Sequence, residues 1–436
     1  LSATFDGTTN FNNSVTLNSA TINGNGLLIA NGGVTVNGNS VLNGVILNNS
    51  SAQQMILNAN LTVNNAAFIN NVGTMDVNGD FNVLSTDGTG VLQNTGTFVR
   101  STGTGVLQIQ TDVINTGVMN IQTGSAVMEN NFTQSRGSLS SAGDVSVDGF
   151  SVWSGGRMNS GGAFNAGGGI AITGNVTLDR VFNNHGVGLL GGAGQMSGSG
   201  QFINSGTFDI QNNGTIGLAL TNNGSLSRSQ GTGTATIAGA FLNAGNLTLR
   251  TGNTVFGSSF TQNSGRFIND ASITVASIVI NGGLVGGNSI INGNVTFNGG
   301  ELAPGNSVGT VIINGDLNLT DNSLLTMEVS GSNIYDKINV SGQATYDGTM
   351  TVTFIDGYSG AVADNYEYIT YSNTVGQFDT INSPLGYRFS NINNSAGNNT
   401  IITIIRKFCC PLSSLFGSNN NNTIRSPCSI DSRSRS

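Results

Sequence analysis

The sequence has few charged residues, few prolines and no cysteine before residue 406. Charged residues make up 8% of the 436-residue chain, far below the quarter that is usual in globular proteins. The three cysteines (Cys409, Cys410 and Cys428) all lie near the C-terminus. Residues 1–405 therefore have neither a disulfide nor a cysteine metal site. No apolar run reaches membrane-spanning length.

Basic residues are especially scarce in most of the chain. Residues 1–405 hold 9 basic and 21 acidic residues, a net charge of −12, whereas residues 406–436 hold 5 basic and 1 acidic residue, a net charge of +4. An acidic, nearly lysine-free body is a poor binder of polyanions, which excludes nucleic acid as the expected partner. The tail, 406–436, breaks the pattern of the chain, and we predict that it is disordered. The sequence opens at Leu1 without a signal peptide, which indicates a fragment or a mature form.

A repeated frame dominates the rest of the sequence. In its clearest copy, Phe202 and Asn204 lie four and two residues before Gly206, and Phe208 and Ile210 lie two and four residues after it. Similar frames are centred on Gly73, Gly96, Gly117, Gly186, Gly224, Gly245 and Gly265. From Gly186 to Gly265 the consecutive spacings are 20, 18, 21 and 20 residues. A fixed period near twenty residues is typical of a solenoid.

Each copy of the frame predicts one rung of that solenoid. Apolar residues at alternate positions indicate short strands with one inward face. Asn-x-Gly between two strands indicates a turn, since both residues tolerate positive φ. Stacked rungs bury what a single rung exposes, and they align the asparagines for hydrogen bonds along the axis. Residues 1–300 are therefore predicted to be all-β and to form a right-handed single-stranded parallel β-helix. Within this range, the glycine-rich stretch 138–175 is predicted to be irregular.

The composition changes at residue 301. All seven tyrosines lie between Tyr335 and Tyr387, which predicts a β-rich C-terminal cap over 301–405. Ala303-Pro-Gly-Asn-Ser, the run from Tyr335 through Lys337 to Gly342, and Gly376-Gln-Phe together resemble the C-terminal passenger region of bacterial type V autotransporters.

That resemblance implies a cell-surface or secreted β-helical passenger whose closing region, autochaperone-like, caps the helix and helps it fold. It also implies a C-terminal outer-membrane barrel, and this sequence continues past Ile405 for only 31 residues. We interpret the missing barrel as a truncation, a frameshift or a release of the passenger.

Candidate catalytic residues are few. His185, the single histidine, lies beside a turn glycine and has no nucleophile motif near it, which favours a turn residue over a general base. Asp76 with Asp80, and Asp144 with Asp148, are each four residues apart. In a strand such pairs face the same side and could act as acid and base. Aspartate is also favoured beside glycine turns, and basic partners are sparse. No catalytic residue is therefore predicted.

Calcium and cofactor sites are not predicted either. Gly191-Gly-Ala-Gly-Gln-Met resembles the start of a calcium-binding repeat but lacks its aspartate. The row of Phe164, Phe182, Phe202, Phe241 and Phe260 could be a carbohydrate-stacking surface, but rung spacing favours an internal stack, and we expect Phe202 and Phe241 to point inward.

The predicted function is a non-catalytic passenger of autotransporter type that acts as a rigid adhesin or stalk. Its expected partners are glycans or host cell-surface molecules. The alternatives are a β-helical lyase or hydrolase of extracellular polysaccharides and a purely structural surface-layer protein.

Overall fold

The computed structural model describes residues 1–394 and 397–407, and the chain divides into two compact units at Val279 and Ile280. Residues 280–300, predicted as the last rungs, therefore belong to the second unit. Apart from Arg406 and Lys407, the predicted tail lies outside the described residues. Over those described residues, no helix is long and apolar enough to cross a membrane.

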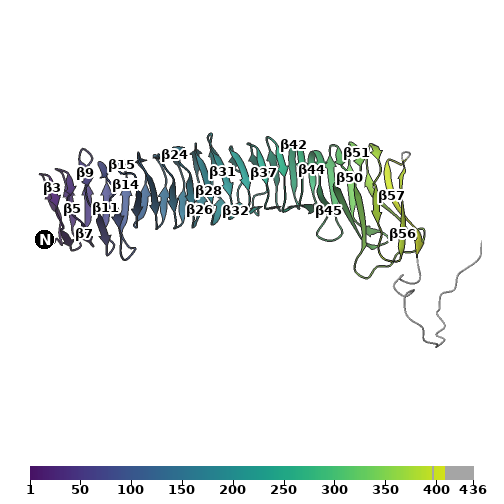
Figure 1. The fold of residues 1–436 in the computed structure, drawn as a ribbon, viewed down its shortest axis with the longest axis horizontal. Coiled ribbons are helices and arrows are strands. Elements are labelled where there is room, and N and C mark those ends of the chain that lie inside the picture. Colours follow the sequence, from purple (N-terminus) through teal and green to yellow (C-terminus); the bar gives the residue numbers. More distant parts are fainter. Residues whose placement is uncertain (395–396, 408–436) are drawn as a thin grey trace, which may run out of the picture. The chain divides into compact units, whose positions relative to one another are not determined.

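Short strands stack one after another along the first unit (Figure 1). Their pairings form three parallel sheets, because each turn of the chain adds one strand to each. Sheet 1 runs from β1 (Ser2–Thr4) to β40 (Phe260–Gln262), sheet 2 from β2 (Thr9–Phe11) to β41 (Arg266–Asn269), and sheet 3 from β3 (Val15–Leu17) to β39 (Asn253–Phe256). Within a sheet, each strand pairs with strands three positions earlier and later in the chain. This architecture is the predicted parallel β-solenoid, with turns of about 20 residues.

Phenylalanines fill the core of the first unit. Phe202 and Phe241 are 0% and 1% exposed, which confirms the inward orientation predicted for both. The ring centroid of Phe182 lies 5.1 Å from that of Phe164 and 5.5 Å from that of Phe202. The centroids of Phe241 and Phe260 lie 5.0 Å apart. The row is thus an internal stack, and the carbohydrate-stacking interpretation of these five residues is wrong.

Buried amide side chains form two ladders along the axis, as predicted. In both ladders Nδ2 of each side chain donates to the side-chain oxygen of the next turn, at 2.6–2.8 Å. The first ladder, on sheet 2, comprises Asn49, Asn71, Asn94, Asn115 and Gln134, and the second, on sheet 1, comprises Asn184, Asn204, Asn222, Asn243 and Gln262. Both ladders end in glutamine.

The glycines on which the repeated frame is centred were predicted to form turns with positive φ, and most of them have a different role. Most of them, Gly206 among them, do not adopt positive φ. The asparagine of the frame is also not a turn residue, because Asn204 is the inward-facing last residue of β31 (Gln201–Asn204). A Cβ on Gly206 would lie 2.1 Å from the carbonyl oxygen of Gly186, and one on Gly224 would lie 2.1 Å from that of Gly206. Glycine is needed here because the backbones of successive turns touch.

The stretch 138–175, predicted to be irregular, keeps the same winding, with one shift of strand register between Leu139 and Ser141. Strands from β21 (Ser138–Ser141) to β27 (Asn175–Leu178) continue all three sheets. Its glycines also mark backbone contact, since a Cβ on Gly161 would lie 1.9 Å from the Ser141 carbonyl oxygen. Trp153 is buried here on sheet 2, in the turn after the first ladder ends at Gln134. The amide ladder changes from sheet 2 to sheet 1 across this stretch.

The second unit continues parallel winding and then closes with antiparallel strands. Its parallel strands include β43 (Leu284–Gly287), β45 (Gly300–Pro304), β48 (Ser323–Gly331) and β52 (Thr349–Phe354). The closing strand β57 (Asn399–Lys407) lies between β53 (Asn365–Thr370) and β56 (Tyr387–Asn394), antiparallel to both. Tyr346, Tyr366 and Tyr368 are buried in this unit. It thus forms the extra β region expected at the C-terminal end.

Candidate functional site

His185 occupies an exposed corner. It follows β28 (Val181–Asn184), and its backbone N–H donates to the carbonyl of Ala166 at 3.0 Å. The structure therefore places His185 in the turn that the sequence indicated.

In neither aspartate pair do the two residues lie on the same strand. Asp76 lies in β12 (Thr74–Asn78), but Asp80 lies beyond its end. Asp144 precedes β22 (Val145–Val147) and Asp148 follows it. The assumption that four-residue spacing places each pair on one strand face is therefore wrong. Glycine corners end these strands after three to five residues.

Two of these carboxylates brace loops of the following turn. Asp80 accepts hydrogen bonds from the backbone N–H of Gly105 at 2.8 Å and from the buried guanidinium of Arg100 at 2.5 Å. Asp144 accepts one from the backbone N–H of Ala163 at 2.7 Å. Such bonds satisfy corner amides that have no strand partner, so both side chains have structural roles.

A buried arginine provides a second kind of brace. Arg180 is 3% exposed, and its guanidinium donates to the Gly162 carbonyl oxygen and, at 2.6 Å, to Ser141 Oγ. Burial lowers the pKa of Arg180 to about 10, because the charged form loses its water. This cation links two earlier turns and is not available to a ligand.

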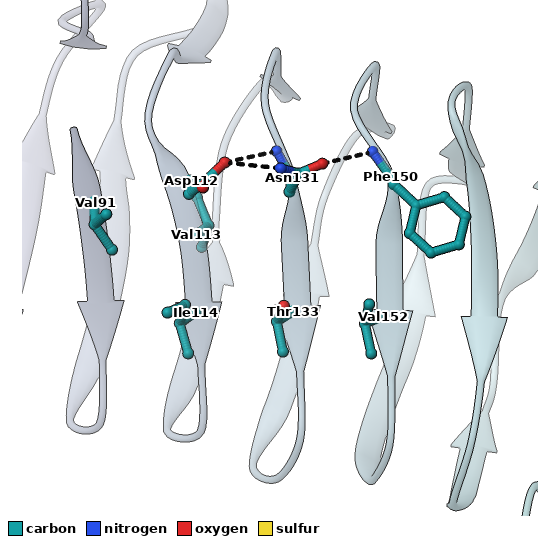
Figure 2. Close-up of a pocket in the computed structure, with 8 residues that line it drawn as sticks. All are labelled: Val91, Asp112, Val113, Ile114, Asn131, Thr133, Phe150 and Val152. Atoms are coloured by element: carbon teal, nitrogen blue, oxygen red, sulfur yellow. Dashed lines mark hydrogen bonds between the residues drawn. The ribbon is translucent and has the colours of Figure 1, made fainter. Parts of the chain in front are cut away.

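The outer face of sheet 2 carries a hollow of about 410 Å³ (Figure 2). It spans four successive turns, on β14 (Val91–Asn94), β17 (Asp112–Asn115), β20 (Phe132–Gln134) and β23 (Ser151–Trp153). It is lined by Val91, Asp112, Val113, Ile114, Asn131, Thr133, Phe150 and Val152. Except for the buried Val113, the lining side chains lie on the outer side of the sheet. The hydrogen bonds of the sheet fix the backbone beneath them.

A line of hydrogen bonds forms one side of this hollow. Asn131 donates to Asp112 Oδ1 through its backbone N–H at 3.1 Å and through Nδ2 at 3.2 Å. The backbone N–H of Phe150 donates to Asn131 Oδ1 at 3.0 Å. Figure 2 shows these three residues in a row along successive turns, with the Phe150 ring pointing away from Asn131. The bonds fix the spacing of the row.

The floor beside that row is mostly apolar. Ile114, Thr133 and Val152 form a second row on the same three turns (Figure 2), and each is half-buried. Phe150 is 39% exposed. Asp112 is the one charged residue among the eight that line the hollow. The hollow thus combines an exposed ring, apolar side chains, a hydroxyl, an amide and one carboxylate.

Sequence reasoning did not identify this hollow. Its signal is that Asp112, Asn131 and Phe150 are each 19 residues apart, which places them at one position of three successive turns. Phe150 also directly precedes the inward Ser151, so strand alternation places it outward. In the described residues, no group of three or more acidic, histidine or cysteine side chains could hold a metal ion.

Comparison with known proteins gives one partial similarity. No protein-family model matches the chain. Over 90 aligned positions the chain is 38% identical to a protein of Brucella suis biovar 1 (strain 1330) named adhesin BmaC autotransporter. The alignment covers 16% of this chain and 3% of that protein. The chain is therefore a parallel β-solenoid with a short region of similarity to an autotransporter adhesin.

Proposed function

We propose that this protein is a secreted or surface-displayed adhesin of the autotransporter-passenger type, and that it attaches through the hollow on sheet 2. The observation that carries the proposal is the exposed Phe150 ring at the hollow, two turns from Asp112 in the same row of side chains. Val91, Ile114 and Val152 line the same hollow, and an exposed apolar patch rimmed by polar residues marks an interaction site. The similarity to a protein named as an adhesin supports the same role.

The solenoid of the first unit suits the presentation of such a surface. Sheet 2 has fourteen strands in this unit, since it takes every third strand from β2 to β41. At about 4.8 Å per turn, their stack extends roughly 65 Å. Stacked rings and amide ladders hold each turn against its neighbours. A rigid stalk keeps a binding face in one orientation and lowers the entropy cost of attachment.

Bead adhesion tests this function directly. Beads coated with the purified chain are expected to attach to epithelial cells, and free chain is expected to compete for attachment. Beads coated with the heat-unfolded chain are the control. If coated beads attach no better than these control beads, the adhesin role fails and the structural surface-layer alternative is favoured. A screen of extracellular polysaccharides for newly formed reducing ends tests the enzymatic alternative with the same preparation.

A further inference from the structure

The main chain beneath the hollow cannot recognise a ligand by strand addition. Strands β14, β17 and β20 each have parallel partners on both sides, and so does β23, whose later partner is β26 (Gly169–Ile172). Their N–H and C=O groups are therefore engaged in the ladders of the sheet. An extended peptide needs an open sheet edge to add as a strand. Recognition at this face consequently depends on side chains.

The side chains offer an apolar surface next to hydrogen-bond acceptors. The ring of Phe150 and the side chains of Ile114 and Val152 form the apolar part. Both hydrogen bonds that Asp112 accepts from Asn131 end on Oδ1, so Oδ2 can accept a bond from a ligand. A carboxylate makes stronger hydrogen bonds to hydroxyl groups than a neutral acceptor does. Linked sugar rings, each with a C–H face and hydroxyl groups at its edge, match this combination.

The charge of the hollow selects among sugars. No arginine or lysine lines it, and its one charged group is the carboxylate of Asp112. A sulfated, sialylated or uronic sugar would bring a second negative charge to a face without a counter-charge. Repulsion between these like charges weakens the binding of an acidic sugar and so discriminates against it. The hollow therefore favours neutral sugars.

The row also suits a chain of sugars rather than a single ring. Asp112, Asn131 and Phe150 lie on three successive turns, which repeat about every 4.8 Å. An oligosaccharide lying along the axis would meet a new side chain at each turn. Because the hydrogen bonds from Asp112 through Asn131 to Phe150 are already formed, the row needs no rearrangement to bind.

We propose that the hollow on sheet 2 binds a neutral oligosaccharide, with Phe150 packed on one sugar ring and Asp112, two turns away, accepting hydrogen bonds from the hydroxyl groups of another. This inference rests on the proposed adhesin function and names the class of its ligand. Two charge-bearing alternatives, an acidic glycan and a basic peptide, are outcomes of the test.

A glycan array followed by calorimetry tests the inference on the full chain. Neutral hexose and N-acetylhexosamine oligosaccharides are expected to bind, and sialylated and sulfated ones are not. F150A is expected to weaken binding about tenfold, through loss of the ring contact. F150W is expected to retain binding. D112N keeps an oxygen for Asn131 but removes the charge, and it should weaken binding several-fold.

The control variant is L242A. Leu242 is 36% exposed and lies on β37 (Phe241–Asn243) of sheet 1, so its replacement should leave binding unchanged. Thermal unfolding of each variant shows whether the fold is intact. Binding of acidic glycans alone on the array, binding of an oligolysine peptide alone in calorimetry, unchanged affinity in F150A, or no binding to the array would overturn the inference. If F150A beads still attach to cells while glycans do not bind, the ligand assignment fails and the adhesin function stands.

Discussion

Asn204 shows how a single residue can serve both the strand and the stack. Its Nδ2 donates to Asn222 Oδ1 at 2.8 Å and to the Ser225 carbonyl at 3.0 Å, and its Oδ1 accepts from Asn184 at 2.8 Å. The side chain is 0% exposed. A buried amide without partners would be costly, so its polar groups are tolerable only because the neighbouring turns supply partners.

We predict that N204L destabilises the first unit. Leucine cannot donate to Asn222 or Ser225, nor accept from Asn184, and each buried polar atom left unpaired costs about 1–3 kcal/mol. The denaturation midpoint in urea should fall accordingly. The control is N223A, because Asn223 is exposed at the following corner. Equal midpoints for the two variants would show that the ladder contributes nothing to stability.

A second residue-scale prediction concerns Gly206. A Cβ there would lie 2.1 Å from a backbone oxygen of the preceding turn, whereas a Cβ on Gly7 would have nothing within 4 Å. G206A should lower the free energy of unfolding by about 1–3 kcal/mol, because the two backbones must separate. G7A serves as the comparison and should be nearly neutral. A neutral G206A would mean that the turns are not in contact at this corner.

At the scale of elements, Asp336 joins three segments of the second unit. It lies between β49 (Ile334–Tyr335) and β50 (Lys337–Val340) and is 1% exposed. Its carboxylate accepts hydrogen bonds from the backbone N–H groups of Gly309 and Glu328, both at 2.7 Å. Burial raises the pKa of Asp336 to about 7, despite those two bonds, which favour the charged form; the nearby charge of Glu328 also raises the pKa.

This shift predicts a pH-dependent stability. Between the ordinary pKa of 3.8 and about 7, the folded state binds a proton that the unfolded state has lost. The contribution of Asp336 to stability should therefore fall as pH rises through that window and stay constant above it. Hydrogen exchange at the Gly309 and Glu328 amides, expressed as protection factors, measures the effect. In D336N, the pH dependence of these protection factors that is due to Asp336 should vanish. An unchanged pH dependence would mean that other carboxylates cause it.

The strands and their stacking were predictable because they follow from local rules repeated many times. Alternation of Phe202, Asn204 and Phe208 around Gly206 determines which side chains face inward, whatever the sheet. The change of the ladder from sheet 2 to sheet 1 was not predictable. It depends on the number of residues in every corner between Ser138 and Asn175, and the sequence pattern does not fix those numbers. The hollow beside Phe150 was missed for a related reason: the exposure of a corner ring depends on the neighbouring turns, which the spacing alone does not position.

At the scale of the whole molecule, the two units differ in what they bury. The second unit buries Tyr346, Tyr366 and Tyr368 at 1–2% exposure. The hydroxyl of Tyr368 donates to Asn391 Oδ1 at 2.7 Å, so this tyrosine combines apolar burial with a hydrogen bond that the phenylalanines in the core of the first unit cannot make. The first unit is built of short strands with glycine at its corners. Glycine loses more backbone entropy on folding than any other residue, which lowers the stability of this unit. In a solenoid, where turns contact mainly their neighbours, order can spread from the most stable region.

We therefore predict that the slowest-exchanging amides of the whole chain lie beyond residue 301, in the cap predicted over 301–405. Hydrogen exchange followed by mass spectrometry gives this map on the intact protein. As a complementary test, residues 1–300 produced alone should fold poorly or aggregate. Late, cooperative unfolding of 1–300 alone would exclude the cap as the folding nucleus.

The ladder on sheet 1 also bears on how such a gene can change in length. Removal of residues 205–222 would join Asn204 to Asn223 and Gly224, which restores Asn-x-Gly at the junction. Asn184, Asn204 and Asn243 would then follow one another, with the same donor and acceptor at every step. In-frame loss or duplication of 18 codons at this point preserves both the Asn-x-Gly pattern and the hydrogen bonds of the ladder. Length can therefore vary by whole turns during evolution, while the residues of the distant hollow keep their register.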